Sequence, residues 1–199
     1  MPRFRQQERD AFLSETRACL LKAAEDEFAS AGYDNANINR ISNAAGLAKG
    51  TVYNYFESKR ALMLALLDEI AQAHIGFVAA QVRAVDDPVQ RLQAFFRAGF
   101  QYVEDHPAQA RVMITTQYGS NLEFKERLFH LYQPMFSLVS EEILASGMQR
   151  GVFRELAPIA AASVLMSVYL GTCSQVDPQG KPYLDPLKVA DFTLHGLQQ

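Results

Sequence analysis

The chain has 199 residues, of which 49% are hydrophobic, and a net charge of −3. This length suits one compact unit or two small, closely packed ones, and the composition excludes a disordered chain. No uninterrupted apolar run approaches the roughly 20 residues that cross a bilayer, and the N-terminus lacks the apolar core of a signal peptide. We therefore expect a cytoplasmic protein without a membrane partner.

Apolar residues recur at helical spacing along nearly the whole chain. The pattern predicts an all-α fold with helices at about 9–31, 38–45, 49–56, 59–83, 88–105, 107–118, 122–150, 158–173 and 185–197. Asn37 and Ser58 are expected to cap the second and fourth helices, and Gly32 to end the first. We expect the helix at 122–150 to bend near Pro134. No strand or repeat is evident.

The segment 37–56 is the most informative part of the sequence. Two short helices are joined by a tight turn at Gly46-Leu47-Ala48, and the small residues Ala44 and Ala45 allow these helices to approach closely. The second helix carries polar and aromatic donors of the kind that reach base edges and phosphates: Lys49, Thr51, Tyr53, Asn54 and Tyr55. A helix-turn-helix uses this arrangement to lay its second helix in the major groove of DNA.

Charge is distributed unevenly along the chain. Residues 1–60 carry a net charge of +1, and residues 61–199 carry −4. Between residues 36 and 60, Glu57 is the one acidic residue beside four basic ones, Arg40, Lys49, Lys59 and Arg60. A small basic face on an acidic body indicates a protein that meets phosphate at one end only.

The stretch from the first helix to Leu66 resembles the tetracycline-repressor (TetR) family of regulators. The resemblance lies in Ile41, Ala44-Ala45-Gly46, Gly50-Thr51, Tyr53, Tyr55-Phe56, Lys59 and Leu62. The rest of the chain is similar only in layout. The resemblance implies a helix-turn-helix DNA-binding domain at 1–57 and a helical ligand-binding and dimerisation domain at 58–199. It also implies a repressor that a small, partly apolar effector releases from a palindromic operator, and a homodimer formed through about 158–173 and 185–197.

The same resemblance implies roles for the polar residues of the motif. Asn37 and Asn39 would contact phosphate and a base edge, Lys49 and Thr51 would lie against bases or backbone, and Tyr53 and Tyr55 would hydrogen-bond phosphate or pack at the backbone. Asn54, a donor by its residue type, completes the expected DNA-binding set. Lys59 would meet phosphate at the start of the fourth helix, where the helix dipole adds attraction. Ala48 stands where the family usually has a Ser or Thr cap, a loss that typically costs about 1 kcal/mol.

Aromatic residues and methionines are frequent in the C-terminal half, and at helical spacing most are expected in the core. The resemblance implies a small-molecule pocket among these helices. Its expected lining is Phe96, Phe100, Met113, Tyr118, Phe129, Tyr132, Phe136, Met166 and Tyr169. Arg111 and Gln117 are candidates for anchoring a polar end of the ligand.

Patterns of catalysis or metal binding are missing from the sequence, so we expect no enzyme, no cofactor and no metal. Glu126 and His130 stand four residues apart and are expected to form a surface polar pair. Cys19 and Cys173 lie far apart and are expected to be packing residues.

Two other functions remain open at this point. One is a nucleoid-associated or constitutive DNA-binding protein without an effector, and the other is a small-molecule carrier whose helix-turn-helix is vestigial. Within the motif, Phe56 is expected in the core. Packing of Tyr53 and Tyr55 in the core, and a merely solvated Lys49, are the alternatives to DNA contacts.

Overall fold

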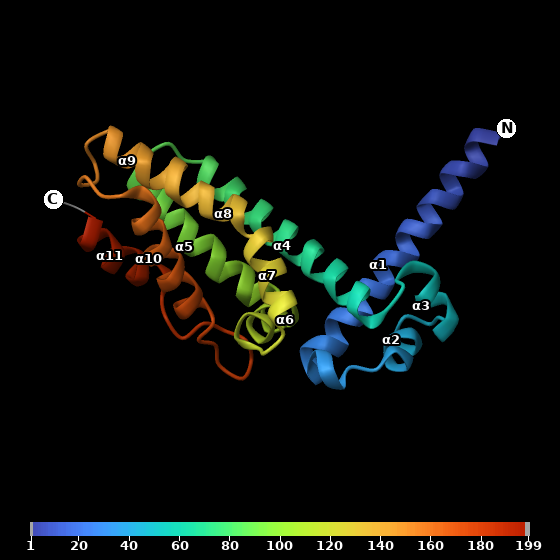
Figure 1. Ribbon diagram of the computed structural model, residues 1–199. Coiled ribbons are helices and arrows are strands. Elements are labelled where there is room, and N and C mark those ends of the chain that lie inside the picture. The colour runs from blue at the N-terminus through green and yellow to red at the C-terminus, as the bar shows by residue number, and fades with distance from the viewer. Residues whose placement is uncertain (1, 198–199) are drawn as a thin grey trace.

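The computed structural model describes the backbone of residues 2–197 and the side chains of residues 9 and 11–197. Helices from the two ends of the chain form two lobes, one around α1 to α3 and a larger one around α5 to α11 (Figure 1). The backbone of 2–197 contains no strand, and Val176 and Pro182 form a single isolated bridge. The prediction of an all-α fold is confirmed.

The N-terminal lobe consists of α1 (Pro2–Asn35), α2 (Ile38–Ala44) and α3 (Lys49–Tyr55). Gly32 interrupts α1 with φ 71°, a left-handed conformation that glycine adopts without steric cost. This is the position at which the sequence predicted the end of the helix. The N-terminal boundary was placed too late, because α1 begins at Pro2 and its first half projects beyond α2 and α3 (Figure 1).

A single long helix, α4 (Lys59–Arg83), joins the two lobes (Figure 1). It begins at Ser58, whose side chain accepts a hydrogen bond from the backbone N–H of Ala61 at 3.0 Å, as predicted. The helix is long and apolar enough to match a membrane span by length and composition. Its apolar residues instead line both cores, with Leu62, Leu66 and Leu67 in the first and Val78 and Val82 in the second.

The C-terminal lobe follows the predicted order with one exception. Its helices are α5 (Pro88–Asp105), α6 (Pro107–Tyr118), α7 (Leu122–Leu131), α8 (Gln133–Ser137), the π-helical segment η1 (Leu138–Ala145), α9 (Ser146–Gln149), α10 (Pro158–Cys173) and α11 (Pro186–Leu197). Proline occupies the first turn of α5, α6, α8 and α10, where its missing N–H leaves no bond unmade.

The exception is the helix expected at 122–150, which is broken rather than bent. Proline cannot donate to the carbonyl four residues before it, so α7 ends at Leu131 and the new helix α8 begins at Gln133 with Pro134 in its first turn. Residues 138–145 then widen into a π-helix, which inserts extra backbone into the helical path.

The two hydrophobic cores meet across the lobes. The N-terminal core, built around Phe28, Ile41 and Val52, also contains Phe124 and Leu128 of α7. Packing therefore continues beyond residue 57, and the domain division at that residue stays a prediction. Among the cysteines, Cys173 is buried as expected. Cys19 is exposed, because its neighbours Leu20 and Leu21 take the inward-facing positions of α1.

Candidate DNA-binding and ligand-binding sites

The start of α2 is fixed by hydrogen bonds to Asn37. The side-chain oxygen of Asn37 accepts from the backbone N–H of Asn39 at 2.8 Å, and its own backbone N–H donates to Oε1 of Glu27 at 2.9 Å. Arg40 lies 3.9 Å from the same Glu27 carboxylate. Asn37 thus caps α2 as predicted, while the side chain of Asn39 is exposed to solvent.

One face of α3 packs inward and the other is open to solvent. Val52 and Phe56 are buried, whereas Lys49, Tyr53 and Asn54 are exposed and Thr51 and Tyr55 are half-buried. The ring of Tyr53 is 47% exposed, which excludes the alternative that Tyr53 is a core aromatic. Ala48 supplies no side-chain cap, as predicted. The outward face of α3 thus presents a polar surface suited to a groove of DNA.

Lys59 has partners that the sequence did not indicate. Its ammonium donates to the backbone carbonyls of Tyr33, Asp34 and Ala36 at 2.8, 3.1 and 3.1 Å, and lies 4.7 Å from the centre of the Tyr33 ring. An ammonium has three N–H donors, and here all three are used. Lys59 therefore ties the α1–α2 connection to the start of α4, and the phosphate contact expected of it competes with these bonds.

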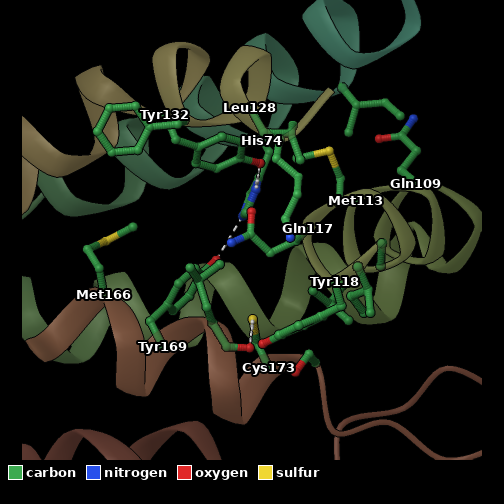
Figure 2. A pocket seen from close by; sticks show the side chains of 18 of the residues that line it. His74, Gln109, Met113, Gln117, Tyr118, Leu128, Tyr132, Met166, Tyr169 and Cys173 are labelled. Atoms are coloured by element: carbon green, nitrogen blue, oxygen red, sulfur yellow. Dashed lines mark hydrogen bonds between the residues drawn. The ribbon is translucent and has the colours of Figure 1, made fainter. Parts of the chain in front are cut away.

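A cavity of about 520 Å³ opens into the C-terminal lobe between α4, α5, α6, α7, α8 and α10 (Figure 2). Most of the expected lining residues border it: Met113, Tyr118, Phe129, Tyr132, Phe136, Met166 and Tyr169. Phe96 and Phe100 do not, because they face the hydrophobic core on the other side of α5. Of the two proposed anchors, Gln117 borders the cavity, and Arg111 borders a smaller neighbouring recess of about 380 Å³.

The inner part of the cavity contains a buried histidine that sequence reasoning missed. His74 of α4 lies with Nδ1 2.7 Å from the Tyr132 hydroxyl and Nε2 2.8 Å from the Tyr169 hydroxyl (Figure 2). Its ring also stacks on Tyr102 with 4.5 Å between centroids. A signal was available, because His74 occupies a core position of α4 between Ile70 and Val78, where a polar residue requires buried partners.

Residues 20–66 match the sequence pattern of bacterial regulatory proteins of the tetR family. Residues 20–66 thus form a TetR-family DNA-binding module. The HTH-type transcriptional repressor KstR2 of Mycobacterium tuberculosis is 28% identical to it over 152 residues, which are 69% of each chain. The HTH-type transcriptional activator FasR of Mycolicibacterium smegmatis is 33% identical over 104 residues, 52% of this chain and 48% of that protein.

A solved structure shares the fold of this chain. The regulator FadR of Bacillus subtilis, in complex with stearoyl-CoA, superposes with a TM-score of 0.76 at 20% identity, covering 89% of this chain and 95% of that one. Together with the match at residues 20–66 and the similarity to KstR2, this fold describes a DNA-binding transcriptional regulator with an N-terminal helix-turn-helix and a C-terminal helical domain.

The cavity is electrically neutral at its inner end. Burial lowers the pKa of His74 to about 4, with a smaller effect from His106. Burial also raises the pKa values of Tyr132 and Tyr169, and that of Cys173 to about 12. Near pH 7 the imidazole, the hydroxyls and the thiol are therefore all uncharged.

Tyr169 owes its position to a glycine. A side chain at Gly99 of α5 would overlap the Tyr169 ring, so α10 can bring that ring against α5 only where α5 has no Cβ. Phe95 packs on the other side of the ring, with 4.7 Å between centroids. The hydroxyl is thereby held toward His74.

A chain of hydrogen bonds leads from the cavity to the helix-turn-helix lobe. Tyr102 donates to Oε1 of Gln109 at 2.5 Å, and the Gln109 amide donates to Oε2 of Glu25 at 2.9 Å. Glu25 lies on α1, is 6% exposed, and accepts from Lys22 at 2.5 Å. Tyr102 and Gln109 both line the cavity, so a ligand there can contact groups that are bonded directly to α1.

Lys49 and Lys59 should respond differently to removal of their charge. We expect Lys59→Met to lower the free energy of unfolding by about 2 kcal/mol, because three carbonyls lose a charged donor. Lys49→Met should leave stability unchanged but weaken DNA binding and lower the slope of log K against log salt by about 1 per monomer. Urea denaturation measures the change in stability, and DNA titrations at several salt concentrations measure the change in affinity and in salt slope. If Lys59→Met changes only the salt slope, Lys59 is a phosphate ligand and not a structural tie.

His74 should make folding sensitive to acid. Its folded pKa of about 4 lies below the ordinary value of 6.5, so the unfolded chain takes up a proton first as the pH falls. The contribution of neutral His74 to the free energy of unfolding is therefore fully present above about pH 6.5. Between that pH and about pH 4 the contribution falls by about 1.4 kcal/mol per pH unit. Urea denaturation at pH 7.5, 6 and 5 gives the free energy of unfolding at each pH. Its fall with decreasing pH should be seen in the wild type and should be smaller in His74→Gln. Equal slopes in the two proteins would contradict the buried neutral imidazole.

Proposed function

We propose that this TetR-family protein is a cytoplasmic, homodimeric repressor that leaves a palindromic operator when a small, partly apolar molecule enters the cavity. It acts as a regulator and not as an enzyme. The observation that carries the proposal is the physical connection between the cavity and the helix-turn-helix lobe, through α4 and through the Tyr102–Gln109–Glu25 chain. Repression rather than activation follows KstR2, which matches a larger share of this chain than FasR does.

The dimer is supported by an exposed apolar face on α10 and α11. Ile159 and Val164 of α10 are 70% and 65% exposed, and Phe192 of α11 is 77% exposed. The same face of α10 carries small residues that permit close helix crossing: Ala160, Ser163, Ser167 and Gly171. Large exposed apolar side chains gathered on neighbouring faces of this kind usually mark an interface. We therefore assign the homodimer interface to about 158–173 and 185–197.

A two-fold dimer presents two recognition helices related by the same symmetry, and this favours a palindromic site. In each subunit the proposed contacts come from the exposed edge of α2 and the outward face of α3. These residues are Asn37, Asn39, Lys49, Thr51, Tyr53, Asn54 and Tyr55. Lys59 is proposed as a further phosphate contact, for which its ammonium must give up hydrogen bonds to backbone carbonyls.

Release by a ligand requires that the ligand bind one arrangement of the lobes better than the other. His74 places the cavity directly on α4, the helix whose beginning is tied to the DNA-binding lobe by Lys59. Gln109 adds a second connection, from the cavity wall to Glu25 of α1. A ligand that shifts α4 or displaces the Gln109 amide therefore changes the position of α1, and with it the spacing of the recognition helices.

The two alternative functions account for less of the molecule. A constitutive DNA-binding protein has no use for a largely apolar cavity of about 520 Å³, a volume typical of small-molecule sites. A carrier with a vestigial motif has no use for exposed polar side chains along α3, where Lys49, Tyr53 and Asn54 face solvent. FadR, solved with stearoyl-CoA, supports a ligand that is apolar over much of its length.

Selection of bound sequences from a random DNA library tests the operator and the dimer together. The wild type should enrich a palindrome, and footprinting should show two protected half-sites. Phe192→Glu should sediment as a monomer and lose at least tenfold in operator affinity, since a buried charge opposes the interface. Leu122→Glu is the matched control, because Leu122 is 71% exposed but lies on α7, outside the interface. Enrichment of a single asymmetric half-site would contradict the proposal that a dimer binds two symmetric half-sites.

The role of the hydrogen-bonded chain can be isolated with Gln109→Met, which keeps the volume of the side chain but removes its amide. This variant should still bind the operator. Its ratio of operator affinities without and with effector should fall by about fivefold or more, a typical coupling energy of 1 kcal/mol or above. The effector for this measurement is the molecule that mass spectrometry finds in the purified protein. An unchanged ratio would leave α4 as the sole connection.

A further inference from the structure

We propose that the inner end of the cavity recognises a neutral carbonyl group on an apolar chain, such as an ester, thioester or ketone, and that His74, Tyr132 and Tyr169 select it. This inference rests on the proposed effector response and names the chemical class of the effector. It is carried by the hydrogen-bond geometry of three side chains that lie at one point of the cavity wall (Figure 2).

Counting donors and acceptors shows what these three side chains leave unused. A neutral imidazole has one N–H donor and one nitrogen acceptor. His74 bonds to the Tyr132 hydroxyl at 2.7 Å and to the Tyr169 hydroxyl at 2.8 Å, so one tyrosine donates to the ring and the other accepts from it. The accepting hydroxyl keeps its own hydrogen. Exchanging the two tautomers of His74 moves this hydrogen from one tyrosine to the other but does not remove it.

The surroundings of that hydroxyl hydrogen call for an acceptor from the ligand. Most of the surrounding side chains are apolar and buried or half-buried, and the neutral amide of Gln117 also borders the cavity; the apolar ones are Ile70, Val103, Met113, Leu128, Phe136 and Met166. A buried O–H among apolar groups gains most from a ligand atom that accepts a hydrogen bond. A carbonyl oxygen supplies this acceptor, and the hydrocarbon on either side of the carbonyl fills the apolar wall.

The charge of the site favours a neutral ligand over a carboxylate. The two ring nitrogens of His74 bond to tyrosine hydroxyls, and the charged lining residues Lys125 and Glu126 neighbour each other on α7, where Glu126 is exposed. Burial keeps His74 itself uncharged near pH 7. An ionised carboxylate at the inner end would therefore lose its hydration without gaining a cation, and this is costly. The free acid of a fatty chain fits this site poorly, while its ester or thioester fits well.

The rim of the cavity suits an apolar chain that extends beyond the inner end. Tyr118 of α6 and Phe129 of α7 are 64% and 68% exposed, and Leu170 of α10 is 37% exposed. Exposed aromatic and aliphatic side chains at a rim can cover hydrocarbon that the cavity does not enclose. The carbonyl can thus belong to a small free ester or ketone, or to the thioester of a larger carrier that remains outside.

Displacement of an uncharged dye from the protein alone tests the inference. The chain contains no tryptophan, so the fluorescence of N-phenyl-1-naphthylamine is read without that background. At pH 7.5 we expect methyl octanoate and 2-nonanone to compete about fivefold more strongly than 1-chlorononane, which matches them in length but accepts hydrogen bonds poorly. Octanoate should compete at least about tenfold more weakly than methyl octanoate. Equal competition by octanoate, or by 1-chlorononane, would overturn the proposal.

Variants identify the residues responsible. A single Tyr→Phe change leaves one hydroxyl that can accept from His74 and keep its hydrogen, and removal of both hydroxyls frees the His74 N–H to donate to the ligand instead. The triple variant His74→Leu, Tyr132→Phe and Tyr169→Phe removes every donor of this cluster and should lose the preference for methyl octanoate over 1-chlorononane. Met166→Leu changes the apolar wall and should keep that preference even if both affinities fall. A triple variant that folds and keeps the preference would refute the assignment, and the wild-type ligand series decides the question if the variant does not fold.

Octanoyl-CoA distinguishes the two sources of the carbonyl. Tighter binding than methyl octanoate assigns the carbonyl to the thioester of a carrier, and weaker binding assigns it to a small free ester or ketone. Because these titrations contain no DNA, they separate the ligand class from the regulatory function. A protein that prefers neutral carbonyl ligands but does not release its operator would retain this inference and lose the proposed function.

Discussion

The helix α4 belongs to both hydrophobic cores at once, and the positions of the other helices depend on it. Its first turns contribute Leu62 and Leu66 to the N-terminal core, and its later turns contribute Val78 and Val82 to the C-terminal core. Since an α-helix is held by bonds along its own backbone, it moves largely as a unit. A change at either end is therefore felt at the other, and the lobes cannot shift independently without disturbing a core.

Most of the helices could be predicted because their ends carry local signals. Three helices are capped by the side chain of the residue before them, Ser58, Asp87 or Asn121. Such residue types can be recognised in the sequence as helix caps. The π-helical segment at 138–145 could not be predicted, because its backbone depends on packing rather than on a residue type. In the candidate sites, too, features set by local sequence could be predicted, and features set by distant residues could not. Exposure of Tyr53 follows from helical period, but the bonds of Lys59 join residues 23 to 26 positions apart.

The cavity residues show a similar limit. Sequence reasoning selected aromatic and methionine side chains by type, and for Tyr132, Phe136 and Met166 this was sufficient. It failed for Phe96 and Phe100, because a large apolar residue on α5 looks the same whether it faces the core or the cavity. It also missed His74, since a polar residue among apolar neighbours gains meaning only when its partners from other helices are known. Those partners, Tyr132 and Tyr169, lie 58 and 95 residues further along the chain.

The unequal exposure of the two cysteines gives the molecule a built-in attachment point. Cys173 is buried and burial raises its pKa to about 12, so its thiol is poorly reactive at neutral pH. Cys19 is exposed on α1, with its sulfur 3.7 Å from the carbonyl of Ala45 at the end of α2. A spin label or fluorophore added to the unmodified protein would therefore attach next to the helix-turn-helix. In a symmetric pair of subunits, the distance between two such labels is a direct ruler for the separation of the recognition helices.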